Sequence, residues 1–345
     1  MEIYDIFDEA IKMKASDIHL TNNSYPVFRK DGELFLIKYF PIMTENLIKK
    51  YYMNLINKAD LNFYEKNKYL DSSFEYNGSR FRLHIYREMN LDAVALRLIP
   101  MEIPTFKEYN IPEILKKIQL LNSGFVIITG VTGSGKSTTI AAILNEINEN
   151  YKKHIITIEN PIEFVHKNKK SIISQREIGK DVLSFSNATR EVMREDPDII
   201  LIGEMRDLDT ISNAVMIAET GHLVLSTLHT GSVPDTIDRI IDVFPSDQQE
   251  QIRIQLADSI QAIVCQSLIP KIGGGRVPCC EIMFQSDAIR AMIKKHANPN
   301  SIIDQMSMES KKTHSQTKIQ SLVNLVKKKL ITSETAFSVL DINGK

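Results

Sequence analysis

The stretch GVTGSGKST at residues 130 to 138 fits the pattern G-x-x-x-x-G-K-[ST] in full. It follows a β-rich run and precedes a helix-forming one, which is the context that a phosphate-binding loop requires. Glycines let backbone N–H groups turn around phosphates, the lysine reaches the β- and γ-phosphates, and the serine offers a hydroxyl to Mg²⁺. We therefore predict binding of ATP and Mg²⁺ by Gly130, Thr132, Gly133, Ser134, Gly135, Lys136, Ser137 and Thr138.

A second nucleotide-like string, INKAD at residues 56 to 60, matches the guanine-reading N-K-x-D of GTPases. It lies upstream of the phosphate loop, whereas a GTPase carries it downstream. We read it as an ordinary helix end, and the expected nucleotide remains ATP.

Three acids are candidates for hydrolysis. DIILIGEMRD, at 198 to 207, is an apolar run that ends in Glu204, but Gly203 stands where a P-loop ATPase usually carries an aspartate. Glu159 and Glu163 belong to ITIENPIEF, where Pro161 stops a strand and leaves both acids at the carboxyl edge of the sheet. A hydrolase needs one acid for the metal and one for the attacking water, and these acids can divide the two tasks.

Two histidines, His222 and His229, bracket the strand-like run GHLVLSTLH. This strand would place His229 at its carboxyl end, within reach of a γ-phosphate. A single histidine at a strand end is more often structural, so this signal is weak by itself.

These residues need a parallel sheet to bring them together. From about residue 113 strand-like and helix-like runs alternate, which predicts a parallel sheet covered by helices. The predicted elements are strands in FVIIT, HIITI, DIILIG and HLVLSTL, and helices after Lys136, at 184 to 195 and at 208 to 219.

The N-terminal part has a different pattern. The pair Asn77-Gly78 predicts a two-residue hairpin turn among antiparallel strands at 71 to 99, preceded by an amphipathic opening helix. Beyond the turn, apolar residues alternate with polar ones, which places Arg82 on a polar face, and Arg97 lies on the next strand. Residues 1 to 99 therefore read as a small α+β domain. Pro100, Pro104 and Pro112 mark 100 to 112 as a linker.

Composition limits the function further. The chain has 345 residues, which suggests two folded units, and 42 basic against 43 acidic residues give no electrostatic case for nucleic-acid binding. Cys265, Cys279 and Cys280 fit a reducing compartment and lack the spacing of a zinc site. The sequence shows no secretory signal and no apolar run long enough to span a membrane, so we expect a cytoplasmic protein.

Four motifs together resemble the ATPases of type II and type IV secretion, and within them the type IV pilus retraction ATPases, the PilT family. They are GVTGSGKST, ITIENPIEFVH, REDPDIILIGEMRD and AETGHLVLSTLHT, in the family's order and spacing. Further matches are ASDIHL, TIDRIIDVFP, LIPKIGGGR and AIRAMIKKH, the last at 288 to 296. The resemblance covers nearly the whole chain.

The resemblance implies a PAS-like domain at 1 to 99 and a RecA-like ATPase domain at 113 to 285, followed by a helical region at 286 to 345, in a homo-hexameric ring. It implies that Glu163 is the catalytic base and that Glu204, with Ser137, serves Mg²⁺. His229 and His222 would sense the γ-phosphate, and Arg82 and Arg97 would reach the nucleotide. The implied function is ATP-driven pilus retraction, in twitching motility, by a cytoplasmic motor held at the membrane by an inner-membrane platform protein.

Alternatives and departures remain. An ATPase for pilus assembly or type II secretion is the nearest alternative, and a RecA-like DNA-dependent ATPase is the alternative from another class. Asn160 replaces the aspartate of the family's E-D-P-I-E, and Lys294 and Lys295 replace the arginine and glutamate of its C-terminal helix motif.

Overall fold

The computed structural model describes residues 2–30, 32–99 and 102–341. The chain divides into two compact units, Met1–Glu102 and Ile103–Lys345, and each has its own hydrophobic core. Pro100, which belongs to the predicted linker, lies outside the described residues.

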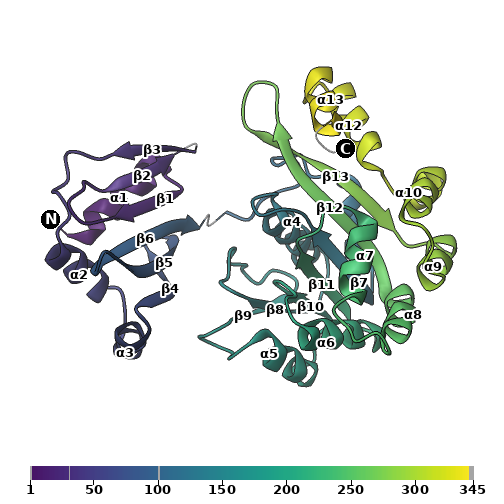
Figure 1. Ribbon diagram of the computed structural model, residues 1–345, viewed down its shortest axis with the longest axis horizontal. Helices are drawn as coiled ribbons and strands as arrows, with labels where there is room; N and C mark the ends of the chain where they lie inside the picture. Colours follow the sequence, from purple (N-terminus) through teal and green to yellow (C-terminus); the bar gives the residue numbers. More distant parts are fainter. Residues whose placement is uncertain (1, 31, 100–101, 342–345) are drawn as a thin grey trace. The chain divides into compact units, whose positions relative to one another are not determined.

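The first unit is an antiparallel sheet in the strand order β3-β2-β1-β6-β5-β4 (Figure 1). Three helices contribute buried residues to the core beneath it. The elements are α1 (Ile3–Met13), β1 (Asp17–Leu20), β2 (Val27–Lys30), β3 (Glu33–Leu36), α2 (Glu45–Met53), α3 (Lys58–Asn67), β4 (Tyr69–Tyr76), β5 (Ser79–Glu88) and β6 (Leu91–Ile99).

The predicted hairpin turn is present between β4 and β5. Asn77 and Gly78 have φ values of 46° and 71°, as a turn with two left-handed central residues requires. The predicted alternation on β5 is also confirmed, because Phe81, Leu83 and Ile85 are fully buried in the core. Residue parity therefore fixes which face of this sheet is polar.

The second unit is a seven-stranded sheet in the order β13-β12-β7-β11-β10-β8-β9. All its neighbouring strands run parallel except β12 and β13, which are antiparallel. Its strands are β7 (Gly124–Thr129), β8 (His154–Glu159), β9 (Ile172–Glu177), β10 (Ile199–Ile202), β11 (Leu223–Leu228), β12 (Ile260–Pro270) and β13 (Arg276–Phe284). The predicted α/β class with a parallel-rich sheet is confirmed.

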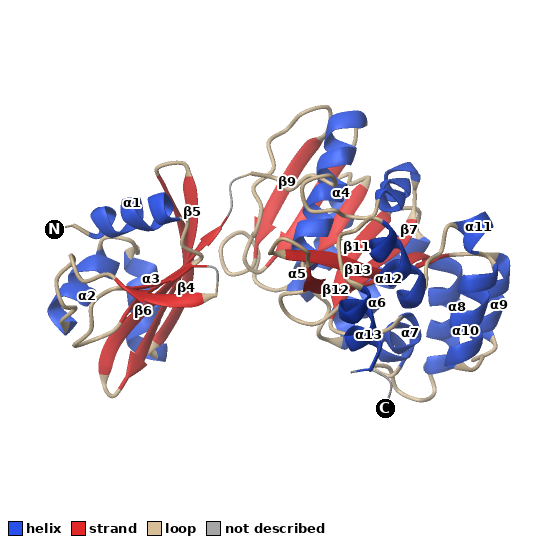
Figure 2. Cartoon of the chain, turned by 90° about the horizontal axis from the view of Figure 1, so that it is seen from above, coloured by secondary structure: helices blue, strands red, loops and turns tan. Residues whose placement is uncertain are grey.

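Helices cover both faces of this sheet (Figure 2). The 3-10 helix η1 (Glu113–Leu120) and α4 (Lys136–Asn150) pack in the core on one face of the sheet. Seven later helical segments pack in the core on the other face. These are α5 (Phe185–Glu191), the 3-10 turn η2 (Val192–Arg194), α6 (Leu208–Glu219), α7 (Val233–Ile241), α8 (Gln249–Ser259), α9 (Asp287–Lys294) and α10 (Pro299–Met308). Strand β7, which leads into the phosphate loop, has side chains in both cores and is thus held between two packed layers.

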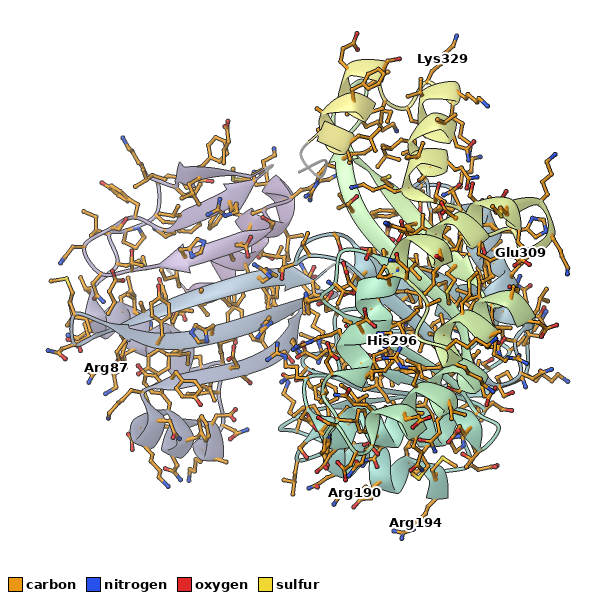
Figure 3. All side chains as sticks on the ribbon, turned by 45° about the vertical axis from the view of Figure 1, so that its right-hand side comes forward. Arg87, Arg190, Arg194, His296, Glu309 and Lys329 are labelled. Atoms are coloured by element: carbon orange, nitrogen blue, oxygen red, sulfur yellow. The ribbon has the colours of Figure 1, made fainter. Side chains whose placement is uncertain are left out.

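The described residues after β13 form mainly helices. After α10 come α11 (Ser310–Thr313), α12 (Lys318–Lys327) and α13 (Ser333–Asp341). His296, beyond α9, and Lys329, beyond α12, have exposed side chains (Figure 3). Strands β9, β12 and β13 were not predicted, because their sequences show neither clean alternation nor a purely apolar run between turn signals.

Candidate active site

The phosphate loop joins β7 to α4. Its glycines Gly130, Gly133 and Gly135 have φ values of 144°, 77° and 85°, which side-chain-bearing residues rarely adopt. Gly135 is the N-cap of α4, so the first free N–H groups of that helix follow the loop directly. The local backbone therefore forms an anion-binding turn at a helix N-terminus.

Lys136 lies inside this loop. Its side chain is 9% exposed, and Nζ donates hydrogen bonds to the carbonyl oxygens of Gly130 at 2.8 Å and Val131 at 3.2 Å. Burial lowers the pKa of Lys136, and the negative charges of Glu163 and Glu204 oppose that shift. The two predicted acids are therefore close enough to the ammonium group to act on it through their charge.

Glu159 and Glu163 occupy different environments after β8. Glu159 accepts hydrogen bonds from the Thr157 hydroxyl at 2.7 Å and from the Gln175 amide at 3.1 Å, and burial raises its pKa. Glu163 is exposed, and its backbone N–H points to Glu159 at 3.5 Å. Glu159 is thus fixed within the fold, whereas the carboxylate of Glu163 is accessible.

The loop that carries Glu163 is tied to β9 on both sides of it. Ile162 N–H donates to a carboxylate oxygen of the buried Glu177 at 3.2 Å, and His166 N–H donates to the Gln175 side chain at 2.8 Å. The Asn160–Pro161 peptide bond that opens the loop is cis. These contacts hold the backbone of Glu163 at the carboxyl edge of the sheet.

Gly203, in the place of the usual aspartate, lies against β8. Its N–H donates to the carbonyl oxygen of Ile158 at 2.8 Å, and a Cβ added there would lie 3.1 Å from that oxygen and 3.3 Å from Glu159 Cα. Such contacts are tighter than side chains normally make. The neighbouring strand therefore leaves little room for a side chain at 203. The acid at the end of β10 is Glu204 instead, and its carboxylate pairs with Arg206 at 2.8 Å.

His229 follows β11 at the same edge of the sheet. Burial and the nearby Lys136 lower its pKa, while the charge of Glu204 opposes them, so the ring lies within electrostatic reach of both residues. The adjacent Thr230 is fastened to the strand before the phosphate loop, because its N–H donates to the Thr129 hydroxyl at 2.8 Å. The loop that carries His229 is thus hydrogen-bonded to the end of β7, directly before the phosphate loop.

Within the chain, His222 lies apart from this group, so its expected role at the γ-phosphate stays a proposal. It precedes the six-residue strand β11, and its carbonyl oxygen accepts a hydrogen bond from Gly124 N at the start of β7. A strand of this length separates its two ends by roughly 20 Å. His222 therefore lies at the amino edge of the sheet, opposite the phosphate loop.

Arg82 and Arg97 are direct partners on β5 and β6 of the first unit. Two like charges opposite each other are unfavourable, and acids on the flanking strands compensate them. Arg97 Nε pairs with Asp17 at 2.8 Å, and Arg82 Nη2 with Asp71 at 3.5 Å. The phosphate loop belongs to the second unit, so a role of these arginines at the nucleotide stays a proposal.

The donor atoms available to a metal are oxygens. Ser137 lies in the first turn of α4, half-buried, and Glu204 follows β10. A hydroxyl and a carboxylate suit Mg²⁺, which usually completes its shell with phosphate oxygens and water. Among the described residues no group of three or more His, Cys, Asp or Glu side chains is placed to hold a metal.

Sequence reasoning missed Gln266, a buried residue of β12 that touches the phosphate loop. Its side-chain nitrogen donates to the carbonyl oxygen of Ser134 at 2.7 Å, and its side-chain oxygen accepts from the Thr139 hydroxyl at 2.7 Å. The available signal was a single amide inside the apolar run AIVCQSLIP. A buried amide needs partners, but the sequence does not say which ones.

Known proteins are similar to this chain in both sequence and fold. The family model described as "Type II/IV secretion system protein" matches residues 2–274. The Type IV pilus retractation ATPase PilT of Pseudomonas aeruginosa is 43% identical over 296 residues, which are 86% of each chain. A Twitching motility protein of Neisseria gonorrhoeae is 40% identical over 332 residues, which cover 94% of this chain and 88% of the relative. The crystal structure of the pilus retraction motor PilT with bound ADP superimposes with a TM-score of 0.90 at 44% identity, covering 98% of this chain and 96% of that one.

Proposed function

Since this chain belongs to the family of type II/IV secretion system proteins, we propose that it is a motor ATPase that drives the retraction of type IV pili. The observation that carries the proposal is the convergence of Glu163, Glu204 and His229 on Lys136 at the carboxyl edge of one sheet. The similarity to a retraction ATPase over 86% of each chain selects retraction among the roles of the family.

Each of these residues has its own role in the hydrolysis of ATP. Lys136 and the loop N–H groups bind the β- and γ-phosphates, and neutral His229 lies beside the γ-phosphate. Glu163 takes a proton from the attacking water, whose oxygen bonds to the γ-phosphorus while the bond to the ADP oxygen breaks. Mg²⁺, when bound at Ser137 with Glu204 nearby, neutralises charge on the phosphate oxygens. The exposed carboxylate of Glu163 suits this role, whereas Glu159 is occupied by other side chains.

Mechanical output requires assembly. The proposed unit is a homo-hexameric ring in which Arg82 and Arg97 of the PAS-like unit complete the nucleotide site, so that hydrolysis moves one unit against the other. The motion would pass to a membrane-embedded platform protein at the cytoplasmic face of the cell membrane. Among the helices of the described residues, none is both long and apolar enough to cross a membrane.

The direct test is phosphate release by the purified chain with ATP and Mg²⁺. We expect turnover that Lys136→Ala abolishes, because the loop then lacks its ammonium group. Strong stimulation by DNA would favour the recombinase-like alternative over a pilus motor. In the cell, a deletion strain should extend pili and fail to withdraw them, and a strain that cannot extend pili at all would point to the assembly ATPase instead.

A further inference from the structure

Gln266 lies on β12, and its side chain links the phosphate loop to the first turns of α4. The side chain is 4% exposed, and both ends of its amide have partners, the Ser134 carbonyl and the Thr139 hydroxyl. Ser134 is part of the loop, whereas Thr139 is on the helix. One buried amide thus fixes the distance between the loop and the helix that follows it.

The glycines of the loop leave the space that Gln266 occupies. A Cβ at Gly130 would lie 2.1 Å from the carbonyl oxygen of Gln266, and a Cβ at Gly135 would lie 2.9 Å from its side-chain nitrogen. The positive φ angles of these glycines are therefore not their only requirement. The loop rests on β12 at Gln266, and no side chain fits between them.

The hydrogen bond to Ser134 also determines where the next N–H points. In a trans peptide, the carbonyl of one residue and the N–H of the next face in opposite directions. Since the Ser134 carbonyl points to Gln266 on β12, the N–H of Gly135 points away from β12. It is therefore free to bind an anion held within the loop.

We propose that Gln266 is a positioning residue for the nucleotide, because it orients the Ser134–Gly135 peptide so that its N–H meets a phosphate. This inference rests on the proposed ATPase function. The peptide contacts phosphates that ATP and ADP share, so its contribution is equal in the ground state and the transition state. Loss of Gln266 must then weaken the binding of both nucleotides and leave the chemical step nearly unchanged.

The test compares Gln266→Met with the wild-type chain. Methionine keeps the length and apolar volume of the side chain but cannot hydrogen-bond to Ser134. We expect the Kd for a fluorescent ADP analogue and the KM for ATP to rise about tenfold together, with kcat within threefold of wild type. A role in folding alone would lower the Tm and leave the nucleotide Kd unchanged, which would overturn the proposal.

Gln316→Met is the matched control. Gln316 donates its amide to the carbonyl oxygen of Cys280 at 2.9 Å, on the strand paired with β12, and its hydrogen-bond partners Cys280, Ile282 and Asn324 all lie outside the loop. It should match the stability loss of Gln266→Met without its loss of ADP affinity. Equal weakening of ADP binding by both substitutions would show that the effect is not specific to the loop, and would contradict the proposal.

Thr139→Val tests the same network from its other end and substitutes for Gln266→Met if that variant does not fold. It removes the hydroxyl that orients the amide, so ADP binding should weaken by a smaller factor, and the substitution should add nothing in the Gln266→Met background. Fully additive losses would contradict a shared network. ADP binding needs no turnover, so a wild-type chain that binds ADP without hydrolysing ATP would refute the proposed function and leave this test intact.

Discussion

At the scale of single residues, the environment of each carboxylate decides its role. Glu159 and Glu163 are four positions apart, yet Glu159 is half-buried with two side-chain donors and Glu163 is exposed near the charge of Lys136. A base must accept a proton from water, so its oxygens must be accessible. The sequence offered both acids, and their surroundings distinguish them.

Glu163→Gln should lower turnover by roughly 10²- to 10⁴-fold, because the amide cannot accept the proton of the attacking water. ATP binding should persist, since the substitution leaves Lys136 and the loop intact. Steady-state phosphate release and nucleotide titration measure the two effects separately. A variant with wild-type turnover would exclude Glu163 as the base.

Glu159→Ala is the contrasting substitution. It removes the acceptor of the Thr157 hydroxyl and one of the two acceptors of the Gln175 amide, which still donates to the carbonyl oxygen of Phe164, so we expect a loss of about 1 to 3 kcal/mol in the free energy of unfolding. Turnover should fall less than in Glu163→Gln. The opposite ranking of the two variants in turnover would reverse the assignment.

At the scale of elements, the spacing of β8 and β10 explains the missing aspartate. Gly203 donates to Ile158 across the two strands, and the Thr227 hydroxyl on β11 donates to the Gly203 carbonyl at 2.5 Å. The strand end is therefore held from both sides. Glu204, one residue later, lies close enough to Lys136 for its charge to act there.

Gly203→Asp should therefore destabilise the chain, although it restores a common ATPase sequence. We expect a loss of about 1 to 3 kcal/mol, from the close contact with Ile158 and from repulsion by Glu159. Gly203→Ala isolates the steric part. Gly231→Ala is the control, because its added Cβ meets nothing closer than 3.9 Å. Equal Tm values for Gly203→Ala and Gly231→Ala in thermal unfolding would contradict a steric restriction at Gly203.

The loop between β8 and β9 should also make stability depend on pH. Burial lowers the pKa of His166 to about 4, and its Nδ1 has no hydrogen-bond partner in the described structure. The unfolded chain takes up a proton on this histidine near pH 6.5, before the folded chain does. The stability that neutral His166 provides is thus complete above pH 6.5 and is lost as the pH falls toward 4.

Urea unfolding of wild type and His166→Gln across this window isolates the effect. The wild-type chain should lose roughly 1 to 3 kcal/mol more than the variant between pH 7 and pH 4. The comparison with the variant is needed because burial also raises the pKa of Glu159 and Glu281. These two acids make the folded chain more stable as the pH falls, which opposes the effect of His166. Parallel stability curves would mean that His166 does not titrate as its burial requires.

At the scale of the whole molecule, the proposed chemistry needs residues from two folded units. The first unit holds Arg82 and Arg97 on its polar sheet face, and the second holds the phosphate loop. Each unit has its own core, so each can move as a body without unfolding. This division is what a motor requires, because hydrolysis in one unit must be able to displace the other.

Arg82→Ala should leave nucleotide binding nearly intact and reduce turnover strongly, since arginines that stabilise a transferring phosphate contribute roughly 10³- to 10⁵-fold elsewhere. Arg190→Ala, at an exposed arginine of α5 (Figure 3), is the control for loss of a surface charge. Normal ATPase activity in Arg82→Ala would remove the case for its role at the nucleotide.

The sequence by itself determined the phosphate loop, the alternation of the sheet and the family, because these depend on local backbone geometry and on motifs that are contiguous in the chain. Tertiary structure decided which residues meet. It set Gly203 against β8 and brought Gln266 into contact with the phosphate loop, 132 positions from Ser134. The physical reason is that a buried polar group and a tight backbone contact are satisfied by neighbouring strands, and no local pattern specifies which strands will be neighbours.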